Sequence, residues 1–316
     1  MQGVILAAGK GSRLQPITLT RSKAMLPILG EPIVERVMEH LAVNGVKDFI
    51  LVVSPDDLHI TRYFRRESEL QVEVRFVYQP KRLGMADALR WAAPLITDDF
   101  ILSACDNLVS AEHVGRMVAA WQESPHPNGL LTLMPVTPEG SGSTGIVEMA
   151  GPWIKRIIEK PDPKEAPSSI SSLPLYCFSR RILDYLPEVA RSPRGEYELQ
   201  DAIQMLIDRD GRVGGVMCEG RLTLTSPADL LAINQHYLTN GDSQPQLAPF
   251  TVGPNTQLIT PLRIERGTTI GANCVIGPNV YVERDCRIGQ GVTIRNAVLL
   301  CEAMVSDGAT VVDQVV

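Results

Sequence analysis

An α/β fold with a mostly parallel sheet, followed by a parallel β-helix, is the architecture that the sequence predicts. From Gly3 to about Phe100, short β-rich runs such as VILAA, FILVV and FILSA alternate with helical stretches such as IVERVMEHLAVNG. This alternation is typical of βαβ units, whose ligands bind at the carboxyl ends of the parallel strands. From Val252 onward, aliphatic residues recur every six positions instead, which indicates a repeat architecture.

The first domain is predicted over residues 1–240, as a Rossmann-like, mostly parallel mixed sheet with helices. After FILSA, the run SAEHVGRMVAAWQE predicts a helix, and GLLTLMPV, GIVEM, IKRIIEKP and LPLYCFS predict further strands. Two more helices are expected, from Glu198 to Arg209 and from Pro227 to Leu238. The polar segment that follows has no periodicity, so residues 241–251 are interpreted as a linker.

The C-terminal repeat covers residues 252–316. A six-residue period places three short strands in each coil of a parallel β-helix, with aliphatic side chains stacked inward and Gly or Asn at turns that need a positive φ. The series resembles the hexapeptide repeat of left-handed β-helices. Its aliphatic positions are Val252, Leu258, Ile264, Ile270, Ile276, Val282, Ile288, Ile294, Leu299, Val305 and Val311.

A catalytic role for the repeat is not expected. Acyltransferases with such β-helices rely on a histidine, and the last histidine of this chain, His236, precedes the repeat. We therefore interpret the repeat as a structural or assembly module. Because stacked coils leave an exposed terminal edge, we expect a homo-oligomer.

The composition excludes several classes of partner. A net charge of −6 over 316 residues argues against a general surface for nucleic acids or anionic membranes. No apolar run approaches the roughly 20 residues that span a bilayer. The six cysteines form no C-x-x-C pair, which favours reduced thiols. The sequence thus predicts a cytoplasmic protein without a membrane or nucleic-acid partner.

The stretch VILAAGKGSRL has two interpretations. A strand that ends in glycines and cations can place backbone N–H groups around a triphosphate, and Arg13 would add a forked donor. The same residues can form an ordinary turn with solvated charges. The spacing completes neither a Walker A loop nor G-x-G-x-x-G, because Leu14 stands where the third glycine belongs.

The continuation of this stretch carries a specific resemblance. LAAGKGSRL followed by SKAMLPILGEPI resembles the opening signature of the sugar-1-phosphate nucleotidyltransferases, in particular the glucose-1-phosphate thymidylyltransferases and uridylyltransferases with a C-terminal left-handed β-helix. YQPKRLGMADAL resembles the base-recognition segment, LSACDNLVS the metal-binding segment, IIEKPDP the E-K-P segment and RGEYELQDAIQ a sugar-side segment. These matches cover about residues 1–240, in the order of the family.

The resemblance implies a role for each matching residue. Arg13 would contact the β- and γ-phosphates, Lys23 the α-phosphate and Lys160 the sugar phosphate. It implies nucleotide binding by Leu6, Ala8, Gly9, Gly11, Ser12, Gln79 and Gly84, sugar binding by Gly145, Glu159 and Glu196, and Mg²⁺ binding by Asp106 and, weakly, Thr223. A hard cation that bridges phosphate oxygens needs a carboxylate such as that of Asp106.

The expected reaction follows from these roles. The sugar-phosphate oxygen would attack the nucleotide α-phosphorus, and pyrophosphate would leave, with cations and Mg²⁺ neutralising the charge. Gln79 can both donate to and accept from one base edge, which fits uracil or thymine and therefore UTP or dTTP. Lys23 is expected on an exposed loop, where its removal costs little stability.

Two departures from the family pattern leave the function open between two readings. Thr223 stands where the family has a second metal carboxylate, and Asp229 cannot replace it because Ser226-x-x-Asp229 predicts a helix cap. Pro174 stands where the family has a glycine near the sugar. The chain is therefore either an active nucleotidyltransferase that makes a nucleoside-diphosphate sugar, or a degenerate regulatory homologue that binds sugar nucleotides with little turnover.

Overall fold

A computed structural model of the protein describes residues 1–123, 125–240 and 249–316, and the chain divides into two units. The first unit contains Met1–Lys10, Thr20–Ala24 and Val34–Arg221, and the second contains Gly11–Leu19, Met25–Ile33 and Leu222–Val316. Each unit thus combines segments that are separate in the sequence. Most of the predicted linker lies outside the described residues, and the predicted domain boundary at residue 240 stays a prediction.

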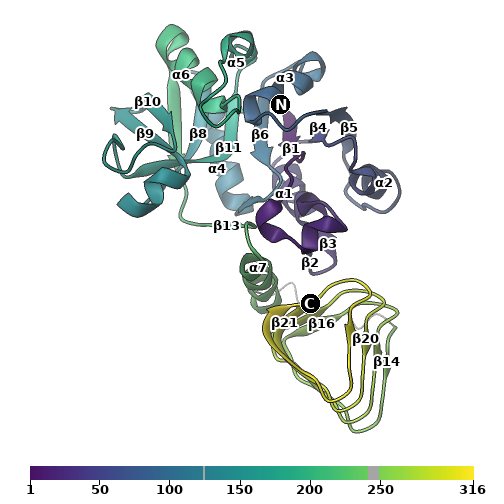
Figure 1. Ribbon diagram of the computed structural model, residues 1–316. Helices are drawn as coiled ribbons and strands as arrows, with labels where there is room; N and C mark the ends of the chain where they lie inside the picture. The colour runs from purple at the N-terminus through teal and green to yellow at the C-terminus, as the bar shows by residue number, and fades with distance from the viewer. Residues whose placement is uncertain (124, 241–248) are drawn as a thin grey trace. The chain divides into compact units, whose positions relative to one another are not determined.

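The first unit is built on a mixed sheet, which is visible in Figure 1. Within the described residues the sheet has nine strands, in the spatial order β5-β4-β1-β6-β11-β8-β12-β10-β9. Their bounds are β1 Gln2–Leu6, β4 Asp48–Val53, β5 Glu73–Tyr78, β6 Phe100–Ala104, β8 Gly129–Pro135, β9 Gly145–Ala150, β10 Trp153–Glu159, β11 Ile170–Phe178 and β12 Val213–Met217.

The parallel half of this sheet brings four chain turns to one edge. β1 pairs in parallel with β4 and with β6, so that Leu6 lies opposite both Val52 and Ala104. β4 pairs in parallel with β5, and Val53 lies opposite Tyr78. The segments that follow Leu6, Val53, Tyr78 and Ala104 therefore meet at the carboxyl edge, which is where the sequence predicts a ligand site.

The antiparallel half accommodates the unexpected proline. β11 runs antiparallel to β6 and to β8, and its pairing with β8 shifts register between Leu173 and Tyr176. Pro174 lies in this bulge, where a residue without an N–H removes no hydrogen bond from the ladder. The proline is thus compatible with a central strand.

Helices connect the strands and cover the sheet. α1 (Ile33–Ala42), α2 (Leu58–Arg66), α3 (Met85–Ala92), α4 (Ala111–Trp121), α5 (Ile182–Tyr185) and α6 (Leu199–Asp210) belong to this part of the chain. α6 and α7 (Pro227–Thr239) confirm the two helices expected there. The sequence patterns did not indicate α2, which has only nine residues and whose N-cap Asp57 accepts a hydrogen bond from the Ile60 N–H.

The core of the first unit lies between the sheet and these helices. Phe100 and Phe178 come from neighbouring strands, both are fully buried, and their ring centroids are 5.9 Å apart. Ile203 and Leu206 of α6 and Leu89 of α3 belong to the same buried cluster. Burial of such side chains contributes about 1.5–3 kcal/mol each, so this core holds the loops at the carboxyl edge in place.

The second unit contains the C-terminal parallel β region, whose strands wind in stacked coils (Figure 1). Val252 pairs with Ile270, and Ile270 with Ile288, each three repeat positions further along the chain. The strands are β14 Thr251–Val252, β15 Gln257–Leu258, β16 Leu262–Ile264, β17 Thr269–Ile270, β18 Val275–Ile276, β19 Val280–Val282, β20 Arg287–Ile288, β21 Thr293–Leu299, β22 Met304–Val305 and β23 Thr310–Val315.

The aliphatic repeat forms the core of this region, as expected. The positions from Ile264 to Val311 are at most 7% exposed, and Asn255, Asn273 and Asn279 have the positive φ that such turns require. Val252 differs, because it is 45% exposed. Its strand β14 lies at one end of the stack of β14, β17, β20 and β22. Among the described residues, no further strand of this sheet therefore covers Val252 on its outer side.

A tight turn near the N-terminus also belongs to the second unit. β2 (Pro27–Ile28) and β3 (Glu31–Pro32) flank Leu29, whose N–H donates to the fully buried Asn234 Oδ1 of α7 at 3.0 Å. Leu29, Leu238, Tyr281 and Val298 form one buried cluster. α7 and the C-terminal parallel β region thus pack against the turn that follows the first signature.

Two further short strands are β7 (Asn107–Val109) and β13 (Arg221–Thr223).

Candidate active site

A cavity of about 320 Å³, which we call the β1 cavity, opens at the carboxyl edge of the sheet. It is lined by Leu6, Ala8, Gly9, Lys10, Gln79, Arg82, Gly84, Met85, Ala88, Ala104 and Glu196. The structure therefore brings together Leu6, Ala8, Gly9, Gln79 and Gly84 from the predicted nucleotide set, together with Glu196 from the predicted sugar set. The sequence reasoning did not assign Arg82, whose Nε donates to the Ala8 carbonyl oxygen at 2.7 Å.

Gly84 is required by the protein's own backbone. Its φ is +101°, and a Cβ at this position would lie 2.5 Å from the carbonyl oxygen of Tyr197. The Tyr197 N–H donates to the Leu83 carbonyl at 2.7 Å, and the Ala86 N–H donates to the Tyr197 carbonyl at 3.1 Å. The segment RGEY is thus hydrogen-bonded to the turn before α3, which places Glu196 at the cavity.

Gln79 is held in one orientation at the end of β5. Its side chain is buried, and its Nε2 donates to the Asp87 carboxylate at 2.7 Å and to the Gly84 carbonyl at 3.4 Å. Asp87 lies in the first turn of α3. Gln79 therefore lines the β1 cavity with its amide donors already engaged by the protein.

Lys23 and Asp106 form a direct ion pair. Their side chains are only 17% and 19% exposed, so the expectation that Lys23 is an exposed loop cation is wrong. Asp106 follows β6, at the place that the sequence predicts. Cys105, which precedes it, is buried, and burial raises the pKa of its thiol to about 12. The thiol therefore stays protonated and is no nucleophile.

Arg221 is a second cation near Asp106 that the sequence reasoning missed. Burial lowers the pKa of its guanidinium, while the negative charge of Asp106 acts in the opposite direction. Its Nη1 also lies 3.5 Å from the Asn107 side-chain oxygen. Its position offered a signal, because Arg221 lies only two residues before Thr223, which the sequence analysis singled out.

Glu159 forms a second polar centre at the end of β10. Its carboxylate lies 3.3 Å from Lys160 Nζ and 3.6 Å from Arg194 Nη2, and Arg194 also pairs with Glu198 at 2.9 Å. The other carboxylate oxygen, Oε2, is buried without a hydrogen-bond partner among the described residues. Burial raises the pKa of Glu159, although Lys160 opposes this. An unpaired buried acceptor of this kind is costly unless a ligand donates to it.

Two neighbours of Glu159 have particular backbone requirements. Gly145 of β9 pairs with Glu159, and a Cβ on Gly145 would lie 3.2 Å from Oε2. Lys160 has a φ of +46°, and its N–H donates to the Thr144 carbonyl at 3.0 Å. Such a conformation is uncommon for residues other than glycine and is frequent at functional sites.

Tyr176 is a buried phenol whose pKa is affected by charged residues of both polar centres. Its hydroxyl is hydrogen-bonded to the Ser172 hydroxyl at 2.7 Å, and burial raises its pKa. The charges of Glu159 and Arg221 both act on this phenol, in opposite directions. The charge of Asp106 acts in turn on Arg221, where it opposes the effect of burial on the pKa of the guanidinium.

Four predicted site residues belong to the second unit, where the structure describes their local geometry. Gly11 has a φ of +63° and precedes the short 3₁₀ turn η1 (Ser12–Leu14), and its carbonyl accepts from the Thr18 hydroxyl at 2.8 Å. Ser12 and Arg13 are exposed, and Thr223 is half-buried at the end of β13.

The expected helix cap is confirmed. The Ser226 side chain accepts from the Asp229 N–H, and the Asp229 carboxylate accepts from the Ser226 N–H, which together form a capping box at the start of α7. A further oxygen contact joins Asp229 to the Thr225 hydroxyl at 2.5 Å. Asp229 is therefore committed to helix capping and is no substitute for the missing metal carboxylate.

The donor set near Asp106 fits Mg²⁺ only in an open arrangement. No group of three or more His, Cys, Asp or Glu side chains in the described part of the chain is placed to hold a metal ion. Mg²⁺ commonly uses one or two protein carboxylates, with waters and substrate phosphates as the remaining ligands. Asp106 has the chemistry of such a ligand, and it is shared with Lys23 in this structure.

Two family models match the chain. The model described as "Nucleotidyl transferase" matches residues 2–240, and the model described as "GMPPB C-terminal domain" matches residues 258–316.

Among the described residues, none of the helices combines the length and the apolar character that a membrane span requires.

Curated relatives match from about three quarters of the chain to nearly all of it. "Bifunctional protein GlmU" of Methanococcus maripaludis is 31% identical over 240 residues, which are 75% of this chain and 54% of that protein. "UTP--glucose-1-phosphate uridylyltransferase AglF" of Haloferax volcanii is 31% identical over 230 residues, which are 72% of this chain and 93% of that protein. Against the first relatives found, the chain spans 54% to 65% of their length.

Solved structures share the fold of about three quarters of the chain. "UTP-bound UGPase from acinetobacter baumannii" has a TM-score of 0.67 at 25% identity and covers 75% of this chain and 92% of its own. "The Crystal Structure of UDP-glucose pyrophosphorylase complexed with UDP-glucose" has a TM-score of 0.68 at 21% identity, with 75% and 97% covered. The second likeness shows the fold alone.

Proposed function

Because the chain belongs to the nucleotidyl transferase family, we propose that it couples UTP or dTTP to a sugar 1-phosphate, releases pyrophosphate and forms a nucleoside-diphosphate sugar. The observation that carries the proposal is the carboxyl edge of the first unit. A cavity with Gln79 and Gly84 opens there, and Asp106 follows the strand β6 that lines the same edge. The unpaired buried oxygen of Glu159 then supplies an acceptor for sugar hydroxyls.

The proposed reaction is a direct displacement. An oxygen of the sugar phosphate attacks the α-phosphorus, the bond from that phosphorus to the bridging oxygen of the β-phosphate breaks, and pyrophosphate leaves. Charge neutralisation and positioning carry most of such a transfer. Lys23 is proposed to contact the α-phosphate, Lys160 the sugar phosphate and Arg13 the β- and γ-phosphates.

Asp106 is proposed to hold Mg²⁺, and Thr223 to contribute a weak ligand. The ion would neutralise phosphate charge when bound. When the substrates are bound, the Lys23 ammonium is proposed to leave the Asp106 carboxylate and to pair with a phosphate oxygen. Asp106 would then be available to Mg²⁺, and each cation would keep one negative partner. Arg221 stays near Asp106 as a further positive charge. Thr223 is neutral where the family has a carboxylate, which also makes the site less negative.

A second candidate function is a degenerate homologue that binds sugar nucleotides with little turnover. Two observations favour it: Lys23 occupies the carboxylate expected to bind the metal, and Arg221 adds positive charge beside it. A cation-rich site of this kind retains anionic ligands yet binds Mg²⁺ weakly. The two functions differ in turnover and share nucleotide binding.

Pyrophosphate release separates the two candidates. The full chain is incubated with Mg²⁺, each of UTP, dTTP, GTP, CTP and ATP, and a panel of sugar 1-phosphates, and released pyrophosphate is measured. The enzyme function predicts release that depends on both substrates and is fastest with UTP or dTTP. Nucleotide binding by calorimetry without any release would contradict the enzyme and support the regulatory homologue.

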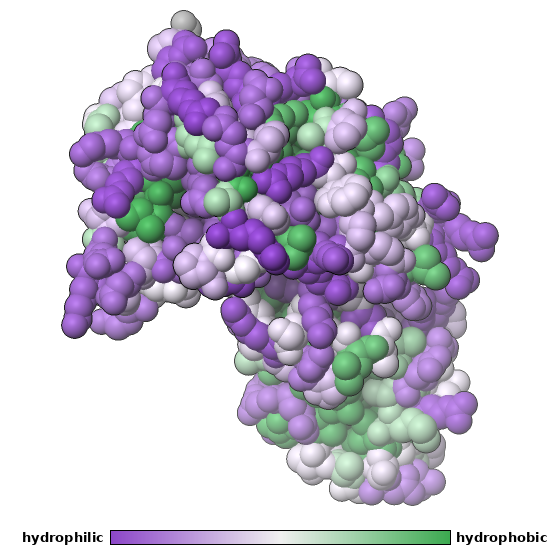
Figure 2. Space-filling view, turned by 45° about the horizontal axis from the view of Figure 1, so that its top comes forward, coloured by the Kyte–Doolittle hydropathy of each residue, from purple (hydrophilic) through white to green (hydrophobic). Residues whose placement is uncertain are grey.

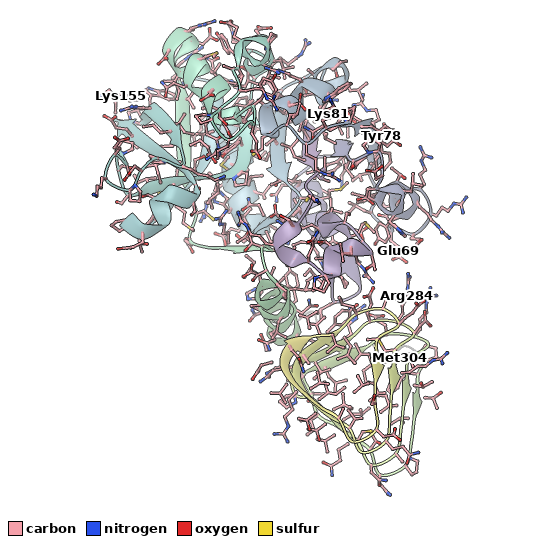
Figure 3. All side chains as sticks on the ribbon, in the orientation of Figure 1. Glu69, Tyr78, Lys81, Lys155, Arg284 and Met304 are labelled. Carbon is pink, nitrogen blue, oxygen red and sulfur yellow. The ribbon has the colours of Figure 1, made fainter. Side chains whose placement is uncertain are left out.

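For the C-terminal parallel β region, we propose a left-handed β-helix of hexapeptide repeats that joins subunits into a homo-oligomer. Its last coil carries exposed apolar side chains: Met304 is 74% exposed, Val316 41% and Val312 40%. Figure 2 shows apolar patches on the surface of this region, and Met304 is labelled in Figure 3. The strands β22 and β23 also end their sheets with unpaired edges among the described residues, which favours association.

Charged substitutions on this coil test the assembly. Met304→Lys together with Val312→Lys is expected to lower the mass of the protein in light scattering, because desolvating two ammonium groups opposes association. Leu58→Lys, at a 69% exposed position of α2, is the matched control and should leave the mass unchanged. A monomeric wild-type protein, or an unchanged mass in the double variant, would exclude this coil as the interface.

A further inference from the structure

We propose that Asp87 is a positioning residue that selects the nucleobase, by holding the Gln79 side-chain amide with its carbonyl oxygen toward the β1 cavity. The proposal rests on the proposed function and names the specificity of the same site. Asp87 does not line the cavity and would act only through Gln79.

The contact decides the orientation of the amide. An ionised carboxylate can only accept hydrogen bonds, whereas a glutamine amide has a donating nitrogen and an accepting oxygen at nearly the same positions. At 2.7 Å from Asp87, the atom that faces the carboxylate must be the donor Nε2. The Gly84 carbonyl, at 3.4 Å from the same nitrogen, is likewise an acceptor. Both neighbours therefore select one amide orientation out of two.

Burial makes this orientation costly to reverse. Gln79 is 3% exposed, so a reversed amide would place its oxygen against the Asp87 carboxylate without water to separate them. Two acceptors in such contact lose the free energy of the hydrogen bond and also repel each other. Gln79 can therefore offer a ligand its Oε1 acceptor, in place of the donor and acceptor pair that the sequence suggested.

An acceptor at this point discriminates among bases. Uracil and thymine carry a donor at N3–H, and guanine carries one at N1–H. Cytosine and adenine have an unprotonated ring nitrogen at the corresponding position, so two lone pairs would face each other. A buried polar group left without its partner is the strongest basis for rejecting a ligand. The locked amide thus predicts preference for uracil, thymine or guanine over cytosine and adenine.

A purely structural role of Asp87 makes a different prediction. Asp87 lies in the first turn of α3, where a negative charge stabilises the helix dipole. Loss of that effect would weaken the fold or all nucleotides alike. Loss of the amide lock would instead change the ratio between two nucleotides, because an unconstrained Gln79 can present either its oxygen or its nitrogen.

The test compares UTP with CTP, which differ on the base edge that Gln79 would contact. Binding to the full chain is measured by calorimetry with Mg²⁺ and without sugar phosphate, so that turnover is not needed. We expect wild-type protein to prefer UTP by at least about tenfold, and Asp87→Asn to reduce this ratio to about threefold or less, since an asparagine amide can pair with either orientation of Gln79. Asp87→Ala is the second variant, with the same expected direction.

Glu112→Gln is the matched control. Glu112 lies in the first turn of α4, with its side chain 82% exposed, so its neutralisation repeats the helix-dipole effect away from Gln79. We expect an unchanged UTP to CTP ratio in this variant. Thermal unfolding of every variant reports whether the fold is retained.

The outcomes separate the inference from the proposed function. A ratio that is the same in wild type, Asp87→Asn and Asp87→Ala overturns the role of Asp87, even if pyrophosphate release proves the enzyme function. A wild-type preference for CTP also overturns it. A ratio that collapses in both variants supports it, even if no sugar phosphate is ever turned over. A wild-type protein that binds no nucleotide overturns both.

Discussion

Replacing Lys23 with methionine is expected to lower kcat by about 10²- to 10³-fold, the usual effect of removing one group that stabilises charge in the transition state. Methionine keeps most of the side-chain volume and removes only the charge. Because Lys23 is paired with Asp106 at low exposure, the substitution also leaves a carboxylate unpaired and should cost roughly 1–3 kcal/mol of unfolding free energy. Pyrophosphate release and chemical denaturation measure the two effects separately.

Two control variants test whether the effects of Lys23→Met come from the charge of Lys23 in this ion pair. Asp106→Asn combined with Lys23→Met removes both charges and should restore part of the stability without restoring turnover. Lys155, labelled in Figure 3, pairs with Glu148 at 2.9 Å with its side chain 64% exposed. Lys155→Met should therefore change neither quantity appreciably. Turnover by Lys23→Met at the wild-type rate would exclude Lys23 from the reaction.

Glu159→Gln is expected to raise the KM for the sugar 1-phosphate by about tenfold to one hundredfold, because hydrogen bonds to a charged acceptor contribute about 1.5–3 kcal/mol. The amide keeps the shape of the side chain but loses the charge that Oε2 would offer to a sugar hydroxyl. The KM for the nucleotide should change little, since Glu159 does not line the β1 cavity. Steady-state kinetics with each substrate varied in turn checks both expectations.

Glu159 also predicts a pH dependence. Burial raises the pKa of this carboxyl, so the charged form is present above the raised pKa and is lost as the pH falls through it. Sugar-phosphate affinity should therefore decrease at acidic pH in the wild-type protein, and the same limb should be absent in Glu159→Gln. Glu148→Gln, on the neighbouring strand β9, serves as control. An unchanged KM and pH profile in Glu159→Gln would remove Glu159 from the sugar site.

Sequence patterns predicted that several candidate residues lie at the carboxyl ends of neighbouring parallel strands, and their placement there agrees with that expectation. Glycines after β1 and Gln79 after β5 come to one edge because parallel strands with short connections align their carboxyl ends. The aliphatic repeat likewise indicated the C-terminal parallel β region. Few architectures bury every sixth side chain in one core, and stacked coils of short strands are one of them. Helix α2 escaped prediction because its nine residues are fewer than the roughly 11–18 residues over which a helical period is recognised.

Side-chain partners were not predictable in the same way. Lys23 and Asp106 are far apart in the chain, so their pairing depends on how the turn after β6 meets the first signature. Arg221 acquires its relation to Asp106 in the same manner. For Gly84, the sequence suggested an approach of the backbone to the base, whereas the tertiary structure shows that Tyr197 of a distant segment already requires the glycine.

The sequence by itself determined which chemical groups this protein can use and along which edge of the sheet they gather, because strand periodicity and chain order are local properties. Only the tertiary structure decided what each group has left to offer a ligand. The Gln79 amide is committed to Asp87, the Lys23 charge to Asp106, and one oxygen of Glu159 is left without a partner among the described residues. Hydrogen-bonding capacity is finite and short-ranged, so its distribution is settled only when distant segments pack together.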